Sequence, residues 1–281
     1  MHKRHLRKSI GLIICVVVVS CTSDTTHTSN SQAKGTAVTH QATVATEQSK
    51  PMENNPYDSL LTLDFILGRF DPAKHPQFSK IPAQHTDKSG IMMHTDALAA
   101  YEEMAAAAKM AGHKLVIRSA ARNFNYQRSI WEAKWSGKRI LSSGINAAKD
   151  ISDPALRAKE IMKYSAMPGA SRHHWGTDID LNAFDNAYFE SGKGKDIYEW
   201  LMAHANTYGY YLVYTAKGDD RPTGYEEEKW HWTYKPISKY LTAFAREQLQ
   251  DSTLTNFSGS ETAPSLEVVK NYVLGIAHDC H

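Results

Sequence analysis

Two short segments of this chain hold the residue types that a catalytic metal ion needs. The first, SRHHWGTDIDLN, covers residues 171–182, and the second, EKWHWTY, covers residues 228–234. A catalytic zinc ion is held by three imidazole or carboxylate ligands, keeps a fourth position for water, and works beside a carboxylate that accepts a proton from that water. The two segments together offer histidine and acidic residues for all of these roles. They therefore predict a site that activates water for hydrolysis.

The spacing within these segments leaves one choice open. Asp180 follows His173 by seven positions, but His174 stands next to His173. An isolated pair of adjacent histidines is more often a surface or hydrogen-bonded pair than a metal site. The spacing alone does not decide which of the two would bind a metal ion.

Both segments also have the alternation of side chains that is typical of strands. Over residues 177–182 polar and apolar residues alternate, which predicts a half-buried strand with Asp180 on its polar face. Over residues 230–234 aromatic and polar residues alternate, which predicts a second strand. Glu228 lies an odd number of residues before His231, so a regular strand would place the two side chains on opposite faces. We therefore expect Glu228 in an irregular segment that leads into the strand.

The two segments resemble the sequence patterns of a known family. SRHHWGTDID fits the pattern SxHxxGxxxD, and EKWHW fits the pattern ExWH, of the zinc D-alanyl-D-alanine peptidases of the VanY type. Their superfamily also holds lysostaphin-like enzymes and hedgehog signalling domains. The similarity runs from about Asp64 to the C-terminus and includes the segment LGRFDPAKHP. It implies a hedgehog/D-Ala-D-Ala peptidase-like fold, which is α+β with a mainly antiparallel sheet flanked by helices.

The resemblance assigns a role to each of the residues that could do chemistry. His173, Asp180 and His231 would bind Zn²⁺. Glu228 would be the catalytic base. Arg122, within SAARNFNYQ, stands where the family has an arginine in a turn that opens a helix, and it would contact the substrate or the charge of the transition state.

Other residues near these positions are expected to contact the substrate. Besides Arg122, these are Ser171, Gln127 and Trp230. Three of these residues have an alternative interpretation: Ser171 holds the turn instead, Trp230 is a core or pocket-wall residue, and Arg118 is a rival of Arg122 because both flank the same turn.

The reaction we expect is removal of one D-alanine from a peptidoglycan stem peptide that ends in D-Ala-D-Ala. Two alternatives stay open: a peptidoglycan endopeptidase or D-Ala-D-Ala dipeptidase of the same fold, and a non-catalytic zinc domain that binds cell-wall peptides. Asp178 departs from the family pattern, because many members have a small apolar residue there. This departure leaves the substrate subtype open, but not the metal site.

The N-terminal region has the composition of an export signal followed by a tether. Residues 1–20 begin with basic residues and continue with an apolar run of ten residues, which is shorter than the ~20 needed to span a bilayer. Cys21 follows a small residue, as in a bacterial lipobox, so we expect a lipoprotein signal peptide and lipidation of Cys21; an ordinary signal peptide is the alternative. Residues 21–56 contain no aromatic residue and are rich in Ser, Thr, Gln and Asn, which predicts a disordered tether. Residues 57–281 would form the catalytic domain.

Charge and cysteine content agree with a membrane-anchored protein outside the cytoplasm. The net charge is +2, and removal of residues 1–20 takes away four basic and no acidic residues, which leaves −2. A nearly neutral chain is not typical of a nucleic-acid binder. Besides Cys21, cysteines occur at Cys15, which leaves with the signal, and at Cys280, so no intramolecular disulfide is possible. We expect a monomer that faces the periplasm or the cell surface and has peptidoglycan stem peptides as its substrate.

The rest of the sequence predicts helices grouped around a mainly antiparallel sheet. The expected strands cover residues 115–119, 177–182, 210–214 and 230–234. The expected helices cover residues 96–111, capped by Thr95, and then 196–208, 236–249 and 265–277, with two more that open after Arg122 and near Asp153.

Overall fold

The computed structural model describes residues 55–281. The expected signal peptide, the lipidated Cys21 and residues 21–54 of the expected tether lie outside these residues. In the described part of the chain, no helix is both long enough and apolar enough to cross a membrane.

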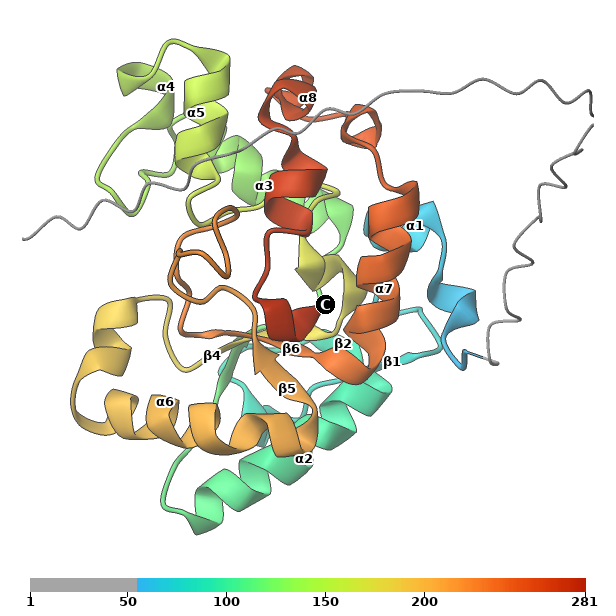
Figure 1. Cartoon of the computed structure of the whole chain (residues 1–281), viewed down its shortest axis with the longest axis vertical. Coiled ribbons are helices and arrows are strands. Elements are labelled where there is room, and N and C mark those ends of the chain that lie inside the picture. The colour runs from blue at the N-terminus through green and yellow to red at the C-terminus, as the bar shows by residue number, and fades with distance from the viewer. Residues whose placement is uncertain (1–54) are drawn as a thin grey trace, which may run out of the picture. The chain divides into compact units, whose positions relative to one another are not determined.

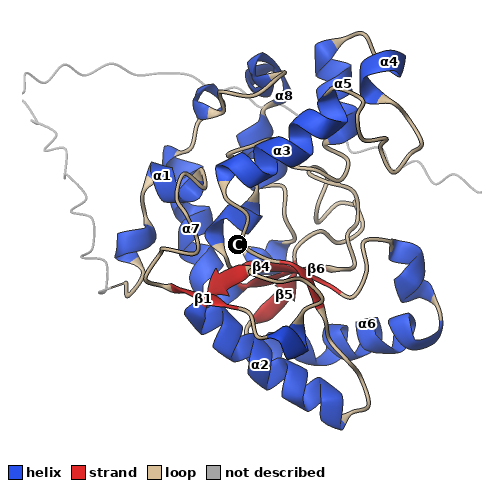
Figure 2. Ribbon diagram, turned by 180° about the vertical axis from the view of Figure 1, so that it is seen from behind, coloured by secondary structure: helices blue, strands red, loops and turns tan. Residues whose placement is uncertain are grey.

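The centre of the fold is a four-stranded antiparallel sheet in the order β3-β4-β6-β5. Its strands are β3 (Ile117–Ser119), β4 (Asp178–Leu181), β5 (Tyr210–Leu212) and β6 (His231–Tyr234). A second, two-stranded antiparallel sheet pairs β1 (Phe78–Lys80) with β2 (Met92–His94). Helices flank the four-stranded sheet on both sides (Figures 1 and 2). The expectation of an α+β fold with a mainly antiparallel sheet is confirmed.

One face of the four-stranded sheet is apolar and packs on two helices. Ile179, Trp232 and Leu212 point to this face, because each lies directly across from its neighbour in the strand register. They belong to one core cluster with buried residues of α2 (Thr95–Met110) and α6 (Gly192–His204). Both figures show these two helices on the same side of the sheet.

The opposite face of the sheet carries the polar residues that the sequence pattern singled out. Asp178 lies across from Thr233, and Asp180 lies across from His231. All four residues of β4 are buried, so the expectation of a half-buried strand is wrong. Other parts of the protein cover both faces of β4. The alternation of polar and apolar residues therefore distinguishes two buried faces, one polar and one apolar, and not a buried face from an exposed one.

The remaining helices lie on the polar side of the sheet. The longest is α7 (Lys235–Gln248), which buries Ile237, Leu241 and Ala245, one residue on each successive turn. With this helix belong α1 (Leu63–Ile66), α3 (Phe124–Trp135), α4 (Ala147–Asp150), α5 (Pro154–Ile161) and α8 (Ala263–Leu266). Buried residues of these helices and of the C-terminal segment form the second core cluster.

Two of the expected element ends are wrong. The cap of α2 is His94, whose Nδ1 accepts a hydrogen bond from the N–H of Asp96, while the hydroxyl of Thr95 donates to the carbonyl of Gln77. The expected last helix does not form as one element, because Glu267 has a φ of 47° and separates α8 from a single π-helical turn over residues 269–273.

Candidate metal centre

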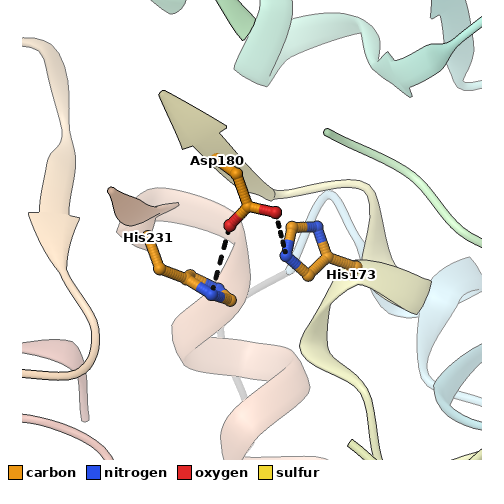
Figure 3. A group of neighbouring side chains, drawn as sticks. All are labelled: His173, Asp180 and His231. Atoms are coloured by element: carbon orange, nitrogen blue, oxygen red, sulfur yellow. Dashed lines mark ion pairs between the residues drawn. The ribbon is translucent and has the colours of Figure 1, made fainter. Parts of the chain in front are cut away.

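The structure brings His173, Asp180 and His231 into one buried cluster. One ligand atom of each residue lies within 4.8 Å of the others. Nε2 of His173 is 3.3 Å from Oδ2 of Asp180, and Nδ1 of His231 is 3.5 Å from Oδ1 of the same carboxylate. Figure 3 shows the carboxylate of Asp180 between the two imidazole rings. The three residues are separated by up to 58 positions in sequence, and the fold alone brings them together.

The pairing of two strands and one tight turn position these three side chains. The antiparallel register of β4 and β6 places Asp180 directly across from His231. His173 comes from a 3₁₀ turn over Arg172–Trp175, which ends at Gly176 with a φ of 70°. A Cβ on Gly176 would lie 2.3 Å from the ring of Phe78. The glycine of the sequence motif is therefore required both for its backbone conformation and for close packing.

The ring of His173 is oriented by a backbone contact. Its Nδ1 lies 2.9 Å from the carbonyl oxygen of Ala120, to which an Nδ1–H donates. This hydrogen bond leaves Nε2 as the nitrogen with a free lone pair, and it faces Asp180. Histidine ligands of metal ions are commonly oriented in this way, by a hydrogen bond from the second ring nitrogen.

His174 is used by the fold itself. Its Nδ1 donates to the carbonyl of Arg122 over 2.6 Å, and its Nε2 accepts from the N–H of Gly169 over 3.0 Å. Burial lowers the pKa of His174 to about 3, so the ring is neutral. Because both nitrogens have partners, His174 has no lone pair to offer a metal ion. The choice that the spacing left open falls on His173.

His231 is held by two carboxylates at once. Its Nε2 donates to Oδ2 of Asp178 over 3.0 Å, and its Nδ1 lies 3.0 Å from Oε2 of Glu228. Burial by itself would lower the pKa of His231, but the hydrogen bonds to Asp178 and Glu228 raise it to about 9. A metal ion bound at Nδ1 would displace the proton from that nitrogen.

A buried network holds Asp178 in turn. Its carboxylate accepts hydrogen bonds from Nε of Arg172 (3.0 Å) and from the hydroxyls of Thr177 (2.9 Å) and Thr233 (2.5 Å). Burial raises the pKa of Asp178, but the charges of Arg172 and His231 outweigh this effect and hold the pKa well below its usual range. In the sequence, Asp178 stands out only as a departure from the family pattern, and Arg172 was not among the predicted site residues. Arg172 and Asp178 could have been recognised as a pair of opposite charges within the segment SRHHWGTDIDLN.

Glu228 lies in the irregular lead-in to β6, as expected. Its N–H donates to the carbonyl of Tyr214, and its own carbonyl accepts from the N–H of His231. These backbone bonds bend the chain so that the two side chains meet in spite of their odd spacing. Burial raises the pKa of Glu228 above its ordinary value.

The donor set of this cluster fits a zinc ion. Two imidazole nitrogens and one carboxylate are typical ligands of catalytic zinc. Nε2 of His173 and Oδ1 of Asp180 are buried, and neither has a hydrogen-bond partner among residues 55–281. Buried polar atoms without partners are rare, and an ion is one of the groups that can satisfy them. His173, Asp180 and His231 could therefore hold the metal.

A protein-family model matches the part of the chain that contains this cluster. The family model described as VanY, D-alanyl-D-alanine carboxypeptidase, matches residues 90–237, which is more than half of the chain. The chain belongs to the VanY family. The resemblance noted from the two motifs is thereby confirmed, and the match contains all residues from Arg122 to Glu228 and His231.

The sequence identity between this chain and individual known proteins is low. The Bacillus subtilis (strain 168) protein named "Putative carboxypeptidase YodJ" is 28% identical over 168 residues, which are 57% of this chain and 50% of YodJ. The chain thus spans about half the length of that relative. The LdcB LD-carboxypeptidase structure has 20% identity and a TM-score of 0.44, covering 68% of this chain and 79% of LdcB. A mutant of the D,D-pentapeptidase VanY with Zn(II) has 23% identity and a TM-score of 0.42, covering 59% of this chain and 88% of that one.

The VanY-family arginine is tied to the metal-site turn by its backbone. The N–H of Arg122 donates to the carbonyl of His173 over 3.0 Å, and its carbonyl accepts from His174. Nε of Arg122 is buried without a partner in the described chain. Its rival Arg118 lies on β3 and is 3.4 Å from the carboxylate of Asp87.

The other expected substrate contacts have different surroundings. Gln127 is buried, its Nε2 donates to the carbonyl of Ala166, and its Oε1 is buried without a partner among the described residues. Ser171 is buried immediately before the 3₁₀ turn. Trp230 is buried between the exposed rings of Tyr164 and Phe184, with centroids 6.3 and 6.4 Å away.

Proposed function

We propose that this chain is a zinc-dependent D-alanyl-D-alanine carboxypeptidase that removes the last D-alanine from peptidoglycan stem peptides. The observation that carries this proposal is the buried cluster of His173, Asp180 and His231, with Glu228 in contact with the last of them. This arrangement places a carboxylate with a raised pKa beside three zinc-type ligands. Membership in the VanY family supports the choice of a D-Ala-D-Ala peptide as the substrate.

The roles of the residues follow from their chemistry. A zinc ion bound by the cluster would supply a Lewis acid that makes water a better nucleophile. Glu228 accepts the proton of that water and passes it to the leaving amine, because a carboxylate with a raised pKa can both take up and release a proton. Arg122 stabilises the negative charge that develops on the scissile carbonyl, because its guanidinium is permanently charged and its Nε is free to donate.

Three further residues bind the peptide in this proposal. Oε1 of Gln127 is a free acceptor, which suits an N–H of the substrate backbone. The hydroxyl of Ser171 donates to the terminal carboxylate. Trp230, with its aromatic neighbours, forms a wall of the site. We further propose that the protein is an exported monomeric lipoprotein, anchored in a membrane through Cys21 and facing the periplasm or cell surface, because peptidoglycan lies there.

A single reaction tests the proposal. The purified chain from residue 22 onward is incubated with a muramyl pentapeptide that ends in D-Ala-D-Ala, once with zinc and once with a chelator, and the products are weighed by mass spectrometry. Zinc-dependent loss of one alanine is the expected result. Loss of a dipeptide, or a cut further inside the stem, would replace the carboxypeptidase by a dipeptidase or endopeptidase. An intact pentapeptide with zinc bound would overturn the proposal in favour of a peptide-binding domain.

A further inference from the structure

A groove beside the metal centre is lined by cationic side chains, of which the proposed reaction uses only Arg122. It has a volume of about 350 Å³ and lies between the segment after β3, the loop over residues 88–92 and the turn over residues 71–73. The groove meets the metal centre at Arg122 and at Ala120, whose carbonyl accepts from His173.

Backbone contacts attach the loop to β3 and the residues after it at both ends of the loop. Thr86 pairs with Ile117 in a parallel bridge, and the N–H of Ala121 donates to the carbonyl of Met92 over 3.0 Å. Between these attachments, the loop and the β3 segment line opposite sides of the groove. Lys88 and Arg118 both line the groove.

The charged groups of the groove are mostly cationic. Lys88, Arg118 and Arg122 line it, against the single acidic residue Asp71. The carboxylate of Asp71 is engaged locally, because it accepts from the N–H of Ala73 over 3.0 Å.

Two of the cations keep donors that the described chain does not use. Nε of Arg118 and Nε of Arg122 are both buried without a hydrogen-bond partner among residues 55–281. Asp87 lies 3.4 Å from Nη1 of Arg118, and with 36% of the side chain exposed the guanidinium keeps another edge for a further acceptor. A guanidinium has five N–H donors in a planar fork, and such an edge matches the two oxygens of a carboxylate.

We propose that this groove binds a carboxylate of the stem peptide, upstream of the scissile bond, through the guanidinium of Arg118, with Lys88 as a second cation in the lining of the same groove. This inference rests on the proposed function, and it adds that the substrate is acidic there. Two positions of a stem peptide can supply the carboxylate: the α-carboxylate of a γ-linked D-glutamate, and the side chain of a diaminopimelate in the third position.

The test compares four pentapeptides: one with both carboxylates free, two with one of them amidated, and one with both amidated. We expect kcat/KM of the wild type to be about 10- to 100-fold higher when the bound carboxylate is free, which corresponds to one hydrogen-bonded ion pair. The two singly amidated peptides show which carboxylate is bound. In Arg118→Gln the ratio of kcat/KM for the free peptide to that for the amidated peptide should fall towards one. The control Arg246→Gln, at an exposed position on α7, should keep the wild-type ratio. Lys88→Gln, on an exposed loop, should also lower this ratio. It tests the proposal if Arg118→Gln fails to fold.

A binding experiment separates failure of this inference from failure of the proposed function. The tetrapeptides that remain after loss of the last alanine are titrated calorimetrically into the wild type and Arg118→Gln. Tighter binding of the acidic tetrapeptide, lost in Arg118→Gln, supports the carboxylate site even if no pentapeptide is cleaved. Equal binding and equal turnover of acidic and amidated peptides in the wild type would overturn it.

Discussion

Oδ2 of Asp178 lies 3.0 Å from Nε2 of His231, and this contact determines which nitrogen of the ring faces the metal cluster. With Nε2 occupied as a donor, Nδ1 is left to point towards Asp180 and Glu228. Asp178, which departs from the family pattern, is thus a hydrogen-bond partner of the candidate metal ligand His231.

Asp178→Asn should weaken zinc binding by about 10- to 100-fold, because carboxylates that orient ligand histidines have effects of this size. The isosteric amide keeps the shape but removes the charge that holds the ring and balances Arg172. Competition with a chromogenic chelator measures the affinity. The exposed Asp196→Asn is the matched control. Unchanged affinity in Asp178→Asn would show that the contact does not orient the ligand.

The two adjacent histidines should respond to substitution in opposite ways. His173→Ala should lose stoichiometric zinc, because it removes the free Nε2. His174→Ala should retain one zinc per chain but lower the free energy of unfolding by about 2–4 kcal/mol, because Gly169 N–H and the carbonyl of Arg122 lose their buried partner. Metal analysis and urea unfolding measure the two effects, and loss of zinc in His174→Ala alone would reverse the assignment.

Glu228→Gln should keep zinc but lower kcat by about 10²- to 10⁴-fold, which is the usual contribution of a positioned general base. The amide cannot accept the proton of water, although it fits the same space. Glu227→Gln is the control, because its side chain is adjacent in sequence but is only partly buried. Turnover close to that of the wild type would refute Glu228 as the base. His231→Ala should instead lose the metal.

Lys134 should give the stability a measurable pH dependence. Burial lowers its pKa from the ordinary 10.5 to about 8, so between pH 8 and 10.5 the unfolded chain binds more protons at this residue than the folded chain does. The contribution of Lys134 to the free energy of unfolding should therefore rise with pH, by about 1–2 kcal/mol between pH 7.5 and 9.5, allowing for its partial exposure. Urea unfolding of the wild type minus Lys134→Met should show this rise, whereas the exposed Lys149→Met should not. A constant difference would contradict it.

Much of the metal centre could be predicted from residue types and local patterns. The motif residues His173, Asp180 and His231 are in one cluster, and the odd spacing of Glu228 correctly indicated an irregular lead-in. The strands of the large sheet were also expected close to where they occur, because alternation of side chains is a local property. The predicted start of α2 is wrong because a contact with a distant residue replaces the local cap: the hydroxyl of Thr95 donates to the carbonyl of Gln77 and does not cap the helix.

The amino-acid sequence by itself determined the family, the types of the candidate metal ligands and the presence of Glu228 as a candidate base. Only the tertiary structure decided how they are used. It shows why His174 cannot replace His173, because Nδ1 of His174 donates to the carbonyl of Arg122 and its Nε2 accepts from the N–H of Gly169. It also gave Asp178 its place beside His231, because strand register brings residues 53 positions apart into hydrogen-bond distance. Such contacts depend on the packing of distant segments, which no local spacing encodes.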